Sequence, residues 1–95
     1  MQVKILGPAE WDLEDGNSFY ESLSRGLGSY FLDSLYSDID SLAFYVGIHA
    51  MSFGFYRSLS RRFPYAIYYR MVENSVIVNA VLDCRRKPGR IREIR

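Results

Sequence analysis

The sequence predicts an α+β domain with an N-terminal strand, an antiparallel helical hairpin and a mainly antiparallel sheet of about four strands, in the order β-α-α-β-β-β. Apolar side chains recur with a helical period in the first half of the chain. Strand-favouring residues dominate the second half, and glycine, proline or asparagine lies between the segments. The chain has 95 residues, enough for one core, so we expect a single domain over residues 1–95.

The first helix is expected to begin just after a short strand at residues 3–6. Gly7-Pro8 closes that strand, and proline suits the first turn of a helix. The residues recurring every three or four positions, which predict the buried face, are Ala9, Leu13, Gly16, Tyr20 and Leu23. The acidic residues assigned to the opposite face are Glu10, Asp12, Glu14, Asp15 and Glu21. Carboxylates at neighbouring helix positions do not converge, so we interpret them as a solvated face and expect no metal site.

A second helix follows a glycine-containing turn at residues 25–28, which predicts that the two helices are antiparallel. Its expected buried stripe is Phe31, Leu35, Ile39 and Leu42. Residues 47–54 contain two glycines and the single histidine, and we expect them to connect the helices to the sheet. His49 is a candidate general base because the pKa of histidine lies near neutrality. Its glycine-flanked position favours an ordinary loop histidine instead.

Three strands are expected in the second half, at residues 55–61, 63–72 and 76–83, with turn chemistry at residues 73–75. The almost continuous apolar run at 76–82 predicts a central strand covered on both faces. In the middle strand, Tyr65 and Tyr69 share one face with Ile67 and Met71, which favours core packing. Tyr68 lies on the other face and is the candidate for an exposed contact.

The charges are segregated along the chain, although the formal net charge is only +1. Residues 1–49 hold two basic and eight acidic side chains, whereas residues 50–95 hold ten basic and three acidic ones. The densest basic cluster comprises Arg85, Arg86, Lys87 and Arg90. Such asymmetry predicts a polyanionic or acidic partner for the C-terminal half.

Several classes of protein are disfavoured. No apolar run approaches the roughly 20 residues of a membrane span, and the acidic N-terminal region does not resemble a signal peptide, so we expect a cytoplasmic protein without membrane contact. The single cysteine, Cys84, cannot form an internal disulfide or hold a metal by itself. We expect no metal and no cofactor.

Three segments of the second half resemble the RelE/ParE superfamily of bacterial toxins. They are Tyr56-Arg57 at the start of a strand, the run from Ser60 to Tyr69, and the ending from Val81 to Pro88. Together with the element order, the resemblance covers essentially the whole chain. It implies the toxin of a type II toxin–antitoxin module, neutralised by a cognate antitoxin and contacting operator DNA only through that antitoxin.

The superfamily has two functional branches, and one of them cleaves messenger RNA in the ribosome without a metal. The resemblance implies that this activity needs converging basic side chains and a tyrosine or histidine near the C-terminus. Arg57 and Arg85 match two of the basic positions. Leu59, Ala66 and Ile91 stand where a second lysine or arginine, a strand arginine and the proton-transfer residue are expected. Three of the five expected roles are therefore unfilled.

We therefore expect the ParE-like branch, which inhibits DNA gyrase through a binding surface. The residues expected to bind the target or the antitoxin are Arg57, Arg61, Arg62, Tyr68, Arg85, Arg86, Lys87 and Arg90. The alternative is a ribosome-dependent endoribonuclease. Its catalytic candidates are Arg57, Arg61, Arg62 and Arg85, and Arg86 is one further basic residue that would take the place of a missing cation. A second alternative is an inactive toxin fold that only binds its antitoxin.

Overall fold

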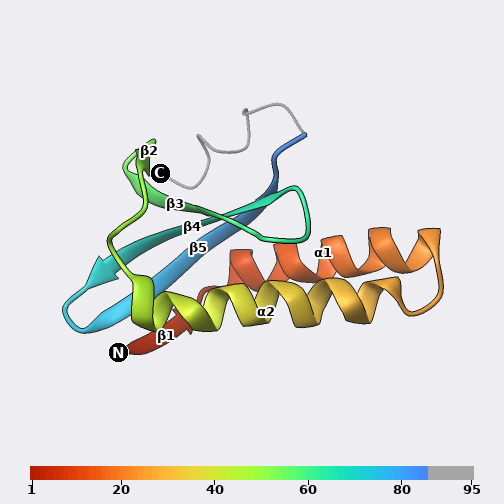
Figure 1. Ribbon diagram of the computed structural model, residues 1–95, viewed down its shortest axis with the longest axis horizontal. Coiled ribbons are helices and arrows are strands. Elements are labelled where there is room, and N and C mark those ends of the chain that lie inside the picture. The colour runs from red at the N-terminus through yellow and green to blue at the C-terminus, as the bar shows by residue number, and fades with distance from the viewer. Residues whose placement is uncertain (86–95) are drawn as a thin grey trace.

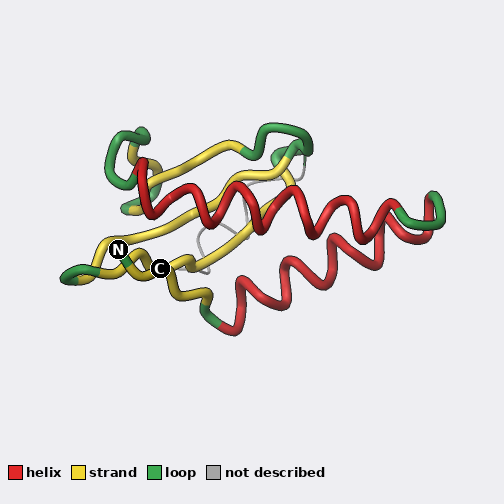
Figure 2. Tube along the Cα trace, turned by 60° about the horizontal axis from the view of Figure 1, so that its bottom comes forward, coloured by secondary structure: helices red, strands yellow, loops and turns green. Residues whose placement is uncertain are grey.

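The computed structural model describes residues 1–85 and has the predicted α+β architecture (Figure 1). A short strand leads into two helices that form an antiparallel hairpin on one face of a sheet. The turn joining the helices reaches beyond the edge of the sheet, as Figure 2 also shows. In chain order the elements are β1 Gln2–Ile5, α1 Gly7–Leu23, α2 Leu27–Tyr45, β2 Met51–Ser52, β3 Phe55–Leu59, β4 Tyr65–Val72 and β5 Ser75–Asp83.

The sheet has five strands in the order β1-β5-β4-β3-β2. Only β1 and β5 are parallel, and the other neighbouring pairs are antiparallel. The prediction for residues 47–54 was incomplete, because this connection contains the two-residue strand β2. Phe53 and Gly54 both have positive φ values, 55° and 85°, and the resulting tight turn folds β2 back onto β3. The central position predicted for the last strand is confirmed, since β5 lies between β1 and β4.

A β-bulge in β5 explains its almost continuous apolar sequence. Tyr68 pairs with Ala80 and Tyr69 pairs with Val78, so Asn79 is the extra residue. Val78 before the bulge and Val81 after it both lie in the core under the helices. In a regular strand, two residues three positions apart would point to opposite faces of the sheet. Ala80 instead joins a second apolar cluster. One strand therefore supplies both clusters.

Helix α1 is fastened to this bulged strand by Asp12. The residue is only 3% exposed, and its Oδ2 atom accepts a hydrogen bond from the Val81 backbone N–H at 3.0 Å. The assignment of Asp12 to a solvated face was wrong, because the bulge turns a strand N–H toward the helix where that carboxylate lies. Leu23, expected to be buried, is 62% exposed because α1 ends beyond the sheet (Figure 1).

The core under the hairpin confirms the predicted stripe of α2. Phe31, Leu35, Ile39 and Leu42 are all buried there with residues of α1, β4 and β5. The helices approach closely at Gly16, where any side chain would clash with the ring of Phe31. None of the helices in residues 1–85 is long and apolar enough to cross a membrane.

Candidate functional site

Arg57 lies on the sheet face opposite the helices, in contact with Tyr68 and Cys84. Its Nε atom donates a hydrogen bond to the Tyr68 hydroxyl at 3.0 Å, and its Nη2 atom lies 3.4 Å from the Cys84 Sγ atom. The guanidinium is also 6.0 Å from the centre of the Tyr68 ring. The hydrogen bond that Arg57 donates to Tyr68 raises the pKa of Arg57. The arginine is thus held in a fixed orientation at the end of the sheet where β5 terminates.

Tyr68 is not the exposed contact that the strand alternation predicted. The residue is 2% exposed and packs in the second apolar cluster, with Phe55, Ala66, Ala80 and partly buried Leu82. Alternation correctly placed Tyr68 away from the helical hairpin, but it could not show that neighbouring strands bury that face. With Arg57 bound to its hydroxyl, Tyr68 has a structural role.

Arg85 follows β5 and is fixed by a carboxylate and a tyrosine. Its backbone N–H and Nε donate to Oδ1 of Asp83 at 2.9 and 3.0 Å, and Nη2 donates to Oδ2 at 2.8 Å. Nη2 also donates to the Tyr20 hydroxyl on α1 at 3.3 Å. The hydrogen bonds that the guanidinium donates to Asp83 raise the pKa of Arg85, and burial raises the pKa of Tyr20.

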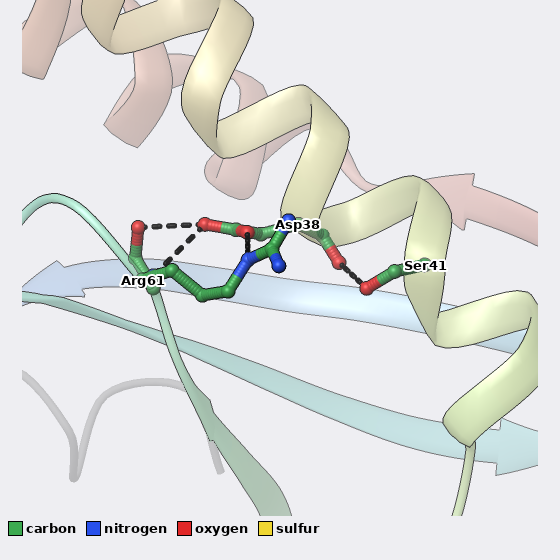
Figure 3. A network of polar contacts seen from close by, with 4 residues as sticks. Asp38, Ser41 and Arg61 are labelled. Carbon is green, nitrogen blue, oxygen red and sulfur yellow. Dashed lines mark hydrogen bonds and ion pairs between the residues drawn. The ribbon is translucent and has the colours of Figure 1, made fainter.

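Arg61 and Arg62 lie in the β3–β4 turn and face helix α2. Oδ2 of Asp38 accepts hydrogen bonds from the Ser60 hydroxyl at 2.7 Å and the Arg61 backbone N–H at 3.2 Å. Oδ1 of Asp38 accepts a third from Arg61 Nε at 3.4 Å (Figure 3). The Arg62 guanidinium lies 5.8 Å from the centre of the Tyr30 ring. Sequence reasoning missed Asp38, because nothing in its helical pattern identifies a partner in a distant turn.

The four described arginines of the expected site therefore have four different sets of partners. Arg57 contacts residues of the sheet, whereas Arg61 and Arg62 contact α2 and Arg85 contacts β5 and α1. Cys84 connects the first and last of these, since it touches Arg57 and precedes Arg85. The predicted site residues Arg86, Lys87 and Arg90, and the position of Ile91, lie outside the described residues.

A second polar group, also missed by sequence reasoning, surrounds the buried Tyr69 hydroxyl. This oxygen accepts a hydrogen bond from the Gly47 backbone N–H at 3.0 Å and lies 2.6 Å from Nδ1 of His49. The ring of Tyr56 stacks on Tyr69 at 5.1 Å between centroids. Burial raises the pKa of Tyr69. His49 thus helps to fasten the segment after α2 to the sheet.

The described surface has exposed apolar side chains but no cluster of metal-ligating residues. Within residues 1–85, no three His, Cys, Asp or Glu side chains are placed to hold a metal ion. Exposed apolar side chains occur instead at the end of α2 and on β2, namely Phe44, Tyr45, Ile48 and Met51.

Comparison with solved structures finds a chain of the same fold. A chain of the structure described as the chromosomal ParDE TA system from P. aeruginosa superposes with a TM-score of 0.74. The alignment covers 85% of this chain and 92% of that chain at 16% sequence identity. No protein-family model and no curated protein matches the sequence. The likeness is therefore one of fold.

Proposed function

We propose that this protein is the toxin of a type II toxin–antitoxin module, that it arrests growth by inhibiting DNA gyrase, and that a cognate antitoxin neutralises it. The fold shared with a chain of a ParDE system supports the module. The choice of gyrase over the ribosome rests on the arginines. Phosphoryl-transfer chemistry without a metal needs several cations directed at one phosphate.

The engagement of each of those arginines by a protein partner of its own is the observation that carries the choice. Arg57 is oriented by Tyr68 on the face away from the hairpin, and Arg85 is oriented by Asp83 and Tyr20. Arg61 is bound to Asp38 at the β3–β4 turn. Each of these guanidinium groups already has its own protein partner, which suits a contact surface better than a set of cations directed at one phosphate. A protein target satisfies this arrangement.

The proposal is tested by inducing the chain alone in growing bacteria. Incorporation of labelled thymidine and labelled methionine is followed together during the first minutes. We expect DNA synthesis to fall first, and the purified protein to reduce supercoiling by purified gyrase. Coexpression of the protein encoded beside it should restore both.

The other outcomes separate the alternatives. If methionine incorporation falls first, messenger RNA should be mapped for ribosome-dependent cleavage, and an Arg85→Ala variant that keeps its fold should lose that cleavage. If neither label falls although the folded protein accumulates, the chain is an inactive toxin fold that serves only as a binding partner. Either result overturns the gyrase proposal.

A further inference from the structure

One end of the molecule carries a group of exposed apolar side chains. Phe44 and Tyr45 end helix α2, Ile48 lies in the connection that follows, and Met51 begins β2. The exposed fractions of these four residues are 84%, 58%, 73% and 58%. The end of α2, strand β2 and the β4–β5 turn lie at the same end of the molecule, away from the turn that joins the helices (Figure 1).

The connection between α2 and β2 is held against the sheet by the buried Tyr69 hydroxyl. The Gly47 backbone N–H donates to this oxygen at 3.0 Å, and Nδ1 of His49 lies 2.6 Å from it. A Cβ atom at Gly47 would lie 3.7 Å from Sδ of Met71 on β4, and Met71 is itself 40% exposed. The exposed apolar residues held together in this way, here called the apolar end, are Phe44, Tyr45, Ile48, Met51 and Met71.

The apolar end lies in a part of the sequence without charged side chains. The chain has 12 basic and 11 acidic residues, but no Asp, Glu, Lys or Arg occurs from Ser41 to Tyr56. A polyanionic or acidic partner would need cations on this surface. In a symmetric dimer each surface meets its own copy, so any charge near the axis would face a like charge. A surface without charges avoids that repulsion and suits a second copy of the chain.

The area of the apolar end is sufficient for a small specific interface. An aromatic side chain has roughly 150–250 Å² of surface, so Phe44 and Tyr45 at their exposed fractions offer on the order of 300 Å². Ile48 and Met51 are exposed to a similar degree, and Met71 adds to them. A specific interface buries about 1,000 Å² or more in total, which is about 500 Å² from each copy. The five side chains together reach this size.

We propose that two copies of this chain associate symmetrically through their apolar ends. Exposed apolar patches of several hundred Å² are features of interaction sites, and this one combines sufficient area with the absence of charge. The small area predicts weak association, with a Kd in the micromolar range. The inference goes beyond the proposed function, because it assigns a partner to residues that the arginine surface does not include.

Sedimentation velocity of the purified full chain, from low to high micromolar concentration, tests the inference. We expect a reversible shift from monomer to dimer that high salt does not weaken, because apolar contacts are not screened. Phe44→Glu and Ile48→Glu should each raise the Kd by about a hundredfold or more, since a symmetric interface would bury the new carboxylate twice. Circular dichroism verifies that both variants keep the fold.

Leu23→Glu is the matched control. Leu23 is also largely exposed, at 62%, but it ends α1 beside the turn that joins the helices. The Kd of this variant should stay within about threefold of the unaltered chain, because the carboxylate remains in solvent. An equal loss of dimer in Leu23→Glu and Phe44→Glu would contradict an interface at the apolar end.

The remaining outcomes also overturn the inference. A chain that stays monomeric at high micromolar concentration does not pair through this surface. If Phe44→Glu then prevents binding of the protein encoded beside it, the apolar end serves that partner instead. A dimer that dissociates at high salt would be held by the opposite charges of the two halves of the chain. No readout involves growth or gyrase, so the dimer and the toxin proposal succeed or fail separately.

Discussion

Two aspartates, one on each helix, fasten the hairpin to the sheet in contrasting ways. Asp12 of α1 lies inside the protein and accepts a backbone N–H of the bulged strand β5. Asp38 of α2 lies at the rim and accepts a hydroxyl, a backbone N–H and a guanidinium from the β3–β4 turn. The interior contact fixes strand register, whereas the rim contact positions a turn that carries two exposed arginines. We expect stability to depend mostly on the first and binding mostly on the second.

Replacing Asp12 should have the largest effect. Asp12→Ala leaves the buried Val81 N–H without this acceptor, and we expect it to reduce the free energy of unfolding by about 3 kcal/mol. Urea unfolding followed by circular dichroism measures the change. Glu14→Ala, an exposed carboxylate on the same helix, is the control and should change the value by no more than about 0.5 kcal/mol. Equal losses in the two variants would contradict a structural role specific to Asp12.

Asp38→Ala should have a smaller effect, because its bonds lie closer to solvent. We expect a loss of about 1–2 kcal/mol, with faster hydrogen exchange at the Arg61 amide, whose acceptor is removed. Asp38→Asn keeps an oxygen acceptor and should recover part of the loss. If exchange in the β3–β4 turn were unchanged in Asp38→Ala, the aspartate would not be what positions the turn.

Asp12 also shows which features of the fold the sequence alone did not predict. The buried stripe of α2 followed from its period alone, because every residue from Phe31 to Leu42 obeys one helical geometry. Asp12 was misassigned because its role depends on the bulge at Asn79, a matter of strand register that local pattern does not encode. The burial of Tyr68 was missed for a related reason, since it depends on side chains from neighbouring strands.

The arginines show the same limit at the candidate site. Their number and basic character were evident from the sequence, but their partners were not. Tyr20 and Asp38 lie far from Arg85 and Arg61 in sequence and meet them only when the hairpin packs on the sheet. Composition therefore predicted a binding surface, and only the packing showed that these arginines have different partners.

Tyr69 has a buried hydroxyl, which gives stability a dependence on alkaline pH. Burial raises its pKa, so its contribution is complete below the ordinary tyrosine pKa of about 10 and is lost as pH rises through the higher pKa of the folded state. Unfolding free energy should therefore fall in alkaline solution above that value. Tyr69→Phe should cost about 1 kcal/mol at neutral pH, because it removes the bonds to Gly47 and His49. In this variant the free energy of unfolding should also decrease less steeply with pH in alkaline solution. If the slope were unchanged, groups other than Tyr69 would be responsible for the decrease.

The smallest effect on stability is expected for Arg61→Gln, which sharpens the comparison most. The Arg61 side chain is 80% exposed and its bond to Asp38 is long, at 3.4 Å, and exposed ion pairs contribute little. We expect the free energy of unfolding to change by no more than about 0.5 kcal/mol. Inhibition of purified gyrase should nevertheless weaken measurably and lose part of its salt dependence, because one exposed cation is gone. Arg25→Gln, in the turn between the helices and distant in the fold from β3, should leave both quantities unchanged. A large loss of stability in Arg61→Gln with unaltered gyrase inhibition would contradict the binding role that we assign to the β3–β4 turn.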